Sequence, residues 1–141
     1  MKRKKIRQLA KLINNGKEIK INFIFASADH FCYRSINSKS SLEISTFYYR
    51  LNFNKILTNL IHEIGHLNTI PQKNAMFVSD YTAEYEANRW AMYRLDELKW
   101  QGVTIEYEKF LHELSNMKIE DDCDEEYQEA AKDVILELGL T

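Results

Sequence analysis

The chain has 141 residues, a length that predicts one domain over residues 1–141. Its 19 basic and 21 acidic side chains nearly balance, which excludes a generally cationic nucleic-acid binder and a wholly acidic disordered chain. No apolar run reaches the roughly 18–20 residues that a membrane span requires, and polar residues interrupt any export signal, so we expect no membrane partner. Two cysteines far apart in sequence, Cys32 and Cys123, favour a reducing, cytoplasmic setting.

The first expected element is a basic amphipathic helix. Four apolar residues recur at helical spacing, and Asn15-Gly16 ends the segment. These apolar residues are Ile6, Leu9, Ala10 and Ile13. The opposite face carries Lys2, Arg3, Lys4, Lys5, Arg7 and Lys11. That face could touch nucleic acid or an acidic partner, but no aromatic platform or known reading motif accompanies it in the sequence. We therefore expect a solvated face and no nucleic-acid partner.

Two strands are expected next. Apolar and polar residues alternate over residues 19–25, and this segment is rich in residues that favour β-structure, which predicts a strand. Residues 26–41 are polar and aperiodic, which predicts a long loop or an irregular hairpin. Residues 42–53 are a second strand candidate, because apolar and β-favouring residues share one face of that segment.

The following segment has the clearest helical period of the chain. Its apolar residues are Ile56, Leu57, Leu60, Ile61, Ile64 and Leu67. Asn54 is the expected N-cap of this helix. Pro71, the only proline, is expected to end it at about Thr69.

Three more helices are expected after a loop over residues 72–79. Ser79 or Asp80 caps a long helix that runs to about Trp100, where Gln101-Gly102 breaks it. A further helix is expected from a cap at Thr104 to Met117. The last helix begins in an acidic cluster, Glu120–Glu126, because negative charge stabilises a helix N-terminus.

The helix with the clear period contains His62-Glu63-Ile64-Gly65-His66, which has the H-E-x-x-H pattern. Residues four apart share a helix face, so His62 and His66 can converge on one ion. Zn²⁺ fits because it binds histidine nitrogens at about 2.0–2.1 Å, and catalytic sites add a third protein ligand and a water. Glu63 lies about 100° around the helix. From there it can take a proton from that water as general base without binding the metal.

A third ligand must come from elsewhere in the chain. No histidine follows at the metzincin spacing, which leaves carboxylates. Glu84 and Glu86 lie on the next helix, but two residues correspond to about 200° of rotation, so only one can face the metal. Glu84 is favoured over Glu86 and Asp80, because it shares a face with an apolar stripe that can pack on the helix of His62 and His66. The stripe consists of Ala87, Ala91, Leu95 and Leu98.

The same pattern predicts that these two helices approach closely. Gly65 in mid-helix costs about 1 kcal/mol relative to alanine, which makes sense if another backbone or a substrate must pass close by. Asn88 lies one turn after Glu84 and could accept the spare N–H of a ligating histidine, a contact that such ligands usually make. Glu86 would point away and form an ion pair with Arg89.

The two segments 62–66 and 84–91 together carry a family resemblance. His62-Glu-Ile-Gly-His66 followed by Glu84-x-Glu-Ala-Asn-x-Trp-Ala91 resembles the ImmA/IrrE family of zinc metallopeptidases, in which H-E-x-G-H precedes E-x-E-A-[ND]-x-F-A. The resemblance covers residues 54–98, with Trp90 in place of the usual phenylalanine. It implies an α+β, zincin-like fold of the gluzincin type, predominantly helical, with a small β-sheet packed on the H-E-x-x-H helix.

The resemblance also implies roles and a partner. It makes His62, His66 and Glu84 the ligands of Zn²⁺ and Glu63 the catalytic base. The family consists of regulatory peptidases of bacteria, phages and mobile elements, and its typical target is a helix-turn-helix repressor. The expected function is therefore zinc-dependent cleavage of a protein partner, such as a transcriptional repressor. The alternative is a peptidase-like fold that sequesters a partner, or blocks a defence protein, without cleavage. Retention of Glu63 favours hydrolysis, because pure binding has no use for a general base.

Overall fold

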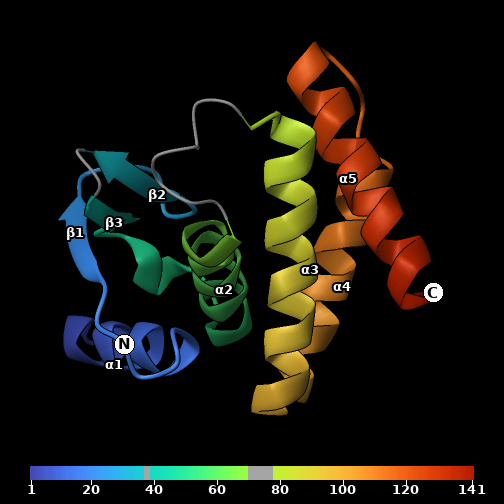
Figure 1. The fold of residues 1–141 in the computed structure, drawn as a ribbon. Helices are drawn as coiled ribbons and strands as arrows, with labels where there is room; N and C mark the ends of the chain where they lie inside the picture. Colours follow the sequence, from blue (N-terminus) through green and yellow to red (C-terminus); the bar gives the residue numbers. More distant parts are fainter. Residues whose placement is uncertain (37–38, 70–77) are drawn as a thin grey trace.

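Within residues 1–36, 39–69 and 78–141, which the computed structural model describes, the chain forms five α-helices and a three-stranded sheet (Figure 1). The elements in chain order are α1 (Arg3–Ile13), β1 (Lys20–Ile24), β2 (Phe31–Ile36), β3 (Lys39–Ser45), a 3-10 turn (Tyr48–Arg50), α2 (Phe53–Thr69), α3 (Asp80–Leu98), α4 (Gln101–Ser115) and α5 (Asp122–Leu138). The fold is therefore α+β, predominantly helical with a small sheet, as expected.

The sheet has the strand order β1-β3-β2, so β2 lies at one edge of it. β1 pairs with β3 in parallel, and β2 pairs with β3 antiparallel, with Tyr33 opposite Leu42. The prediction of a loop or irregular hairpin over residues 26–41 was half right: the segment holds β2 and the start of β3. The strand expected over residues 42–53 ends at Ser45 instead. The Ser45 hydroxyl accepts a hydrogen bond from the backbone N–H of Phe47 at 3.0 Å, and this local bond turns the chain.

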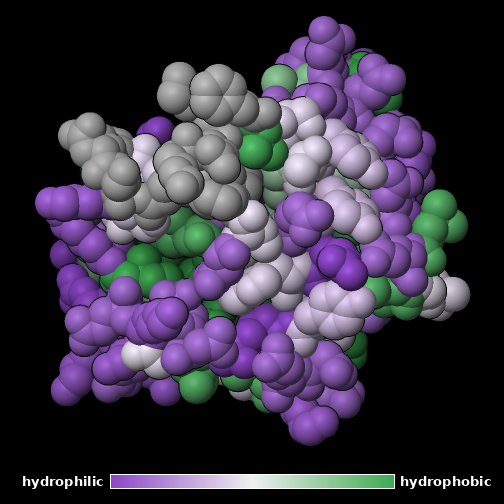
Figure 2. All heavy atoms as spheres, viewed as in Figure 1, coloured by the Kyte–Doolittle hydropathy of each residue, from purple (hydrophilic) through white to green (hydrophobic). Residues whose placement is uncertain are grey.

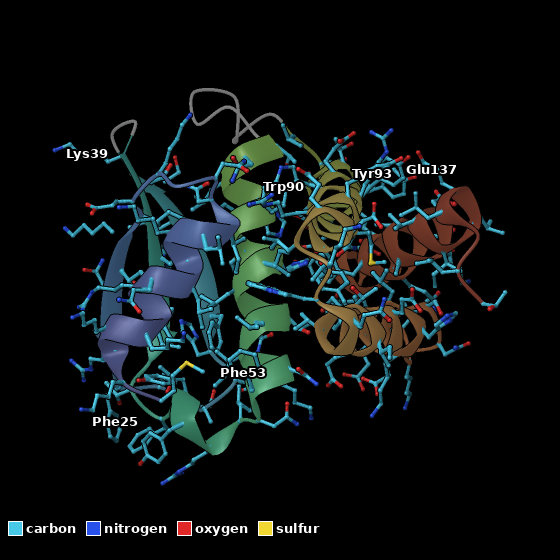
Figure 3. All side chains as sticks on the ribbon, turned by 90° about the horizontal axis from the view of Figure 1, so that it is seen from below. Phe25, Lys39, Phe53, Trp90, Tyr93 and Glu137 are labelled. Carbon is cyan, nitrogen blue, oxygen red and sulfur yellow. The ribbon has the colours of Figure 1, made fainter. Side chains whose placement is uncertain are left out.

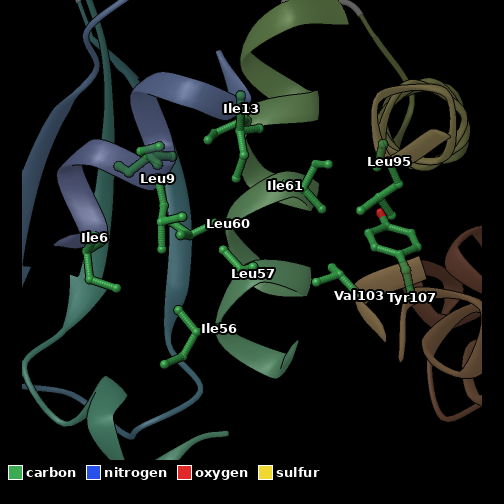
Figure 4. Packing of buried hydrophobic residues seen from close by; sticks show 14 of the residues in the cluster. Ile6, Leu9, Ile13, Ile56, Leu57, Leu60, Ile61, Leu95, Val103 and Tyr107 are labelled. Atoms are coloured by element: carbon green, nitrogen blue, oxygen red, sulfur yellow. The ribbon is translucent and has the colours of Figure 1, made fainter. Parts of the chain in front are cut away.

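α2 lies in the middle of the molecule, with the sheet and α1 on one side and α3 to α5 on the other (Figure 1). Its apolar residues point both ways, toward Ile6, Leu9 and Ile13 of α1 and toward the helices beyond (Figure 4). One continuous hydrophobic cluster therefore includes residues of all five helices and of the sheet. The central position explains why α2 shows apolar period on more than one face.

Several helix ends differ from the sequence prediction. The cap of α2 is Asn52, whose Oδ1 accepts from the N–H of Lys55 at 2.9 Å, and not Asn54. The break between α3 and α4 falls at Lys99, which has a left-handed backbone with φ of 55°, and not at Gln101-Gly102. Gly102 instead lies in the first turn of α4, beside the side chain of Asn54. Thr104 is therefore inside α4, and the helix ends at Ser115.

Other caps agree with the sequence. The Ser79 hydroxyl accepts from the N–H of Thr82 and caps α3. Asp121 caps α5, and the acidic side chains that follow it lie in the first turn, where they were expected. Pro71 and most of the loop expected over residues 72–79 lie outside the described residues. None of the helices in the described part of the chain combines the length and apolar character needed to cross a bilayer.

Candidate metal centre

Two histidines of α2 point to one place beside α3. His62 and His66 are one helical turn apart, so their imidazoles leave the same face of α2. Their Nε2 atoms are 3.2 Å apart, and the exposed fractions of the two side chains are 13% and 3%. Two ring nitrogens this close, in a largely buried place, need a proton or a cation between them, because their lone pairs repel each other.

α3 contributes the third group to this cluster. The two carboxylate oxygens of Glu84 lie 3.1 Å from Nε2 of His62 and 3.2 Å from Nε2 of His66. Corners of a tetrahedron separated by these distances lie about 2.0 Å from its centre, the distance at which Zn²⁺ binds nitrogen and carboxylate oxygen. The spacing and the chemistry of the three groups therefore fit a zinc ion. Among the described residues, these three form the one group of metal-ligand side chains close enough to share an ion.

His62 and Glu84 each favour the charged form of the other. Burial alone lowers the pKa of His62, but attraction to Glu84 and a hydrogen bond that the imidazole donates to this carboxylate outweigh it and raise that pKa to about 9. Burial alone raises the pKa of Glu84, but the two histidines outweigh it and hold this pKa well below its usual range. Glu84 is thus an anion, and the proton that it stabilises on His62 lies where a divalent cation would bind in its place.

Glu63 lies next to the cluster and is held by β2. Its Oε2 accepts a hydrogen bond from the backbone N–H of Tyr33 at 3.3 Å. The Tyr33 ring stacks on His66, with ring centroids 4.5 Å apart. Burial raises the pKa of Glu63 above its usual value, against the lowering effect of the two histidines. A glutamate with a raised pKa is a stronger base than a solvated one.

A close contact between backbones sets the distance between α2 and α3. A Cβ added at Gly65 would lie 2.8 Å from the carbonyl oxygen of Ala87 and 3.3 Å from its Cα. The reason proposed for a glycine in mid-helix is therefore confirmed: another backbone passes there. Because Ala87 lies three residues after Glu84, this contact also fixes how far the Glu84 carboxylate reaches toward the histidines.

The back of the cluster is closed by a buried tyrosine of α4. The Tyr107 hydroxyl lies 2.8 Å from Nδ1 of His62 and donates to Oδ1 of Asn88, also at 2.8 Å. The sequence placed Asn88 in contact with a ligating histidine; in the structure Tyr107 hydrogen-bonds to both residues, and Asn88 also helps to raise the pKa of His62. Both Tyr107 and Asn88 are 0% exposed. Burial raises the pKa of Tyr107 well above its ordinary value, so the hydroxyl keeps its proton.

This chain of hydrogen bonds fixes which nitrogen of His62 carries a proton. A tyrosine hydroxyl has one hydrogen, and the one on Tyr107 goes to Asn88. The hydroxyl must then accept from Nδ1–H of His62. In the neutral imidazole this leaves Nε2 with its lone pair free, and Nε2 is the atom that faces Glu84 and His66. Tyr107 thus holds His62 in the form that binds a metal through Nε2.

Other residues considered from the sequence lie away from the cluster. Asp80 accepts a weak hydrogen bond from the thiol of Cys123 at 3.3 Å and is not part of the ligand group. Glu86 is not part of it either, as expected. The ion pair expected between Glu86 and Arg89 is wrong, because Arg89 pairs with Glu137 of α5 at 2.9 Å. The end of α5 reaches the arginine from the other side of α3, which the sequence could not show.

Two residues near the cluster were missed by sequence reasoning. Tyr33 lies in a segment expected to be a loop or hairpin, so no face could be assigned to it. Tyr107 had a detectable pattern, because Val103, Tyr107 and Leu111 recur every four residues and form the buried side of α4. A tyrosine within such an apolar stripe needs a partner for its hydroxyl, and that need points to a buried polar site.

Comparison of the chain with family models, with curated proteins and with solved structures finds no match.

Proposed function

We propose that this chain is a zinc-dependent endopeptidase with a zincin-like fold of the ImmA/IrrE type. The observation that carries the proposal is the cluster itself. Two imidazole nitrogens and one carboxylate are spaced as zinc ligands, and a second glutamate with a raised pKa lies beside them. A zinc ion bound by His62, His66 and Glu84 would act as a Lewis acid that activates water and polarises a peptide carbonyl.

Glu63 performs the proton transfers in this proposal. One of its oxygens is held by the Tyr33 N–H, and the other, which has no hydrogen bond to a described residue, accepts a proton from the attacking water. The hydroxide adds to the peptide carbonyl carbon, and the carbon–nitrogen bond then breaks. The protonated Glu63 gives its proton to the leaving amide nitrogen, so the products are a carboxylic acid and an amine. The raised pKa of Glu63 suits both the acceptance and the release of this proton.

The position of β2 supports a peptide as the substrate. β2 is an edge strand of the sheet that the described residues form, and its outer side reaches the cluster, because the Tyr33 N–H donates to Glu63 there. An extended peptide can add to such an edge through main-chain hydrogen bonds. The natural target in this proposal is a protein regulator, such as a helix-turn-helix repressor of a phage or mobile element.

The test combines zinc analysis with a cleavage assay. Purified protein should hold about one zinc per chain by mass spectrometry, and His62→Ala should lose it. Cleavage of a library of internally quenched peptides should fall about 10²-fold or more in Glu63→Gln, while bound zinc is unchanged. Glu86→Gln is the matched control and should cleave at the wild-type rate. Equal cleavage by Glu63→Gln would disprove the mechanism. Zinc binding without any cleavage would replace peptidase activity by partner sequestration.

A further inference from the structure

A strongly basic surface lies on the sheet side of the molecule, across α2 from the metal centre. Eight of the 19 lysines and arginines fall within residues 1–20, and Glu18 is the single acid in that range. α1 buries its apolar side against the core and turns its basic side outward. Figure 2 shows this as a hydrophilic area over α1 at the lower left. The charge is therefore gathered on one part of a chain that is acidic overall.

Two arginines of this surface share one aromatic ring. The guanidinium carbon of Arg3 lies 4.7 Å, and that of Arg7 5.2 Å, from the ring centroid of Phe23 in β1. Within the described residues no carboxylate lies within 4.0 Å of either guanidinium. Two like charges held over one ring repel each other, and an anion bound between them relieves that repulsion. Forked guanidinium groups recognise phosphate in particular.

A row of aromatic rings continues from Phe23 through the buried ring of Tyr48 to rings that are exposed. Neighbouring rings of the row have centroids 5.3 to 6.4 Å apart. The row runs Phe23, Tyr48, Tyr49, Phe47, Phe25. At its far end a third arginine, Arg50, lies 4.5 Å from the ring centroid of Phe47. Phe25 is 87% exposed and Tyr49 58% exposed, and Figure 3 shows Phe25 at the margin of the molecule.

From this arrangement we propose that the surface binds single-stranded nucleic acid. The phosphates contact Arg3, Arg7 and Arg50, and unpaired bases stack on the exposed rings of Phe25 and Tyr49. Stacking on aromatic side chains within a basic groove is how single strands are held without sequence preference. The sequence argued against nucleic acid because it showed no aromatic platform; the fold brings together Phe25, which follows β1, and Tyr49 of the 3-10 turn, through the ring of Phe47.

A single strand fits this surface better than a membrane does. An amphipathic helix that lies on a bilayer inserts its apolar face, but the apolar face of α1 is already packed in the core. The rings that remain exposed are flat platforms next to guanidinium groups, which suits alternating bases and phosphates. The proposal does not depend on the metal centre, which lies on the other side of α2.

The experiment measures binding of fluorescein-labelled oligothymidylate to the full chain by fluorescence anisotropy. Affinity should fall steeply between about 50 and 200 mM salt, as phosphate contacts require. Phe25→Ala should weaken binding about 10-fold or more by removing one stacking platform, with the salt dependence unchanged. Arg3→Gln combined with Arg7→Gln should reduce the slope of log affinity against log salt by about 1.4, the value for two lost contacts to a single strand.

Matched controls come from the opposite end of the chain. Leu136→Ala removes an apolar side chain that is 79% exposed, and Lys118→Gln with Lys132→Gln removes two exposed charges. Both controls should bind like the wild type. Absence of binding at low salt, equal affinity for duplex, or an unchanged affinity of Phe25→Ala would overturn the proposal. So would tighter binding to phosphatidylserine vesicles than to the oligonucleotide. Zinc content and peptide cleavage report separately on the metal centre.

Discussion

α3 makes polar contacts on two sides, and the two sides differ in burial. Toward α2 it presents Glu84, whose side chain is 16% exposed, and Asn88, which is fully buried. Toward α5 it presents Arg89, 41% exposed, which pairs with Glu137, 33% exposed. On that side Tyr85 also donates to Glu137, and Tyr81 donates to Asp133.

Similar carboxylate contacts on the two sides of α3 should therefore contribute differently to stability and to metal binding. When a buried carboxylate loses a hydrogen-bond donor, water cannot replace that donor. One of the two partners is then left buried without a hydrogen bond. A carboxylate at the surface exchanges one partner for water at little cost. We therefore expect substitutions on the α2 side of α3 to change metal binding and stability strongly, and substitutions on the α5 side to change them slightly.

The largest effect should come from Glu84→Ala. It removes one of the three proposed ligands and leaves His62 and His66 facing each other without their anion. Zinc affinity, measured by competition with a chromophoric chelator, should fall more than about 100-fold, beyond the range for loss of an outer hydrogen-bond partner. Glu86→Ala, two positions along the same helix, should bind zinc like the wild type. A normal affinity in Glu84→Ala would show that the ligand face of α3 is misassigned.

Gly65→Ala tests the backbone contact that sets the helix separation. The new methyl group would lie 2.8 Å from the Ala87 carbonyl oxygen, so α2 and α3 must move apart. Unfolding by urea should show a loss of about 1–3 kcal/mol in the free energy of unfolding, the usual cost of overpacking.

Gly102→Ala is the control for that substitution. There the added Cβ meets only the side-chain amide of Asn54, at 3.2 Å, in the first turn of α4. A flexible amide can move aside, and alanine favours helix over glycine, so stability should stay the same or rise. Equal losses in Gly65→Ala and Gly102→Ala would remove the special role of the α2–α3 contact.

Tyr107→Phe should have an intermediate effect. The ring still fills its place in the core, but Nδ1 of His62 and Oδ1 of Asn88 lose their shared partner. Zinc affinity should fall about 10- to 100-fold, as it does when the outer partner of a ligating histidine is lost. NMR of the histidine ring nitrogens in the zinc-loaded protein should show a changed Nδ1–H resonance of His62. Tyr93→Phe removes a hydroxyl from a side chain that is half exposed and should change neither measurement.

The smallest effect is expected from Glu137→Gln on the α5 side. The substitution weakens the ion pair with Arg89 and the hydrogen bond from Tyr85, both at the surface. The free energy of unfolding should change by about 1 kcal/mol or less, and zinc affinity should not change. If Glu137→Gln lowered the free energy of unfolding as much as Gly65→Ala does, burial would not determine how much these polar contacts stabilise the fold.

The part of the site that could be predicted from the sequence lies on two helices with strong local patterns. His62 and His66 are related by helical spacing alone, and Glu84 shares its face with the alanines that pack on α2. The partners that close the site come from elsewhere. Tyr33 lies on an edge strand within a segment for which the sequence predicts a loop or hairpin, and only the pairing with β3 shows which way its side chain and N–H point.

Tertiary packing decided the remaining differences. Tyr107 meets His62 only because α4 packs behind α2 and α3, an arrangement that no local pattern encodes. Arg89 pairs with Glu137 and not with Glu86, because α5 packs against α3 there. The caps at Asn52 and Asn54 differ by two residues, which is the usual uncertainty of a helix end.

The contact between Gly65 and Ala87 also bears on how this chain can diverge over evolution. Only glycine at position 65 avoids the Ala87 carbonyl oxygen, so this position accepts almost no replacement while α2 and α3 keep their spacing. The outer faces of α4 and α5 carry no such restriction and can drift freely. We expect distant relatives to keep a short signature in α2 and α3, with glycine at the equivalent of position 65, long after their overall identity has disappeared.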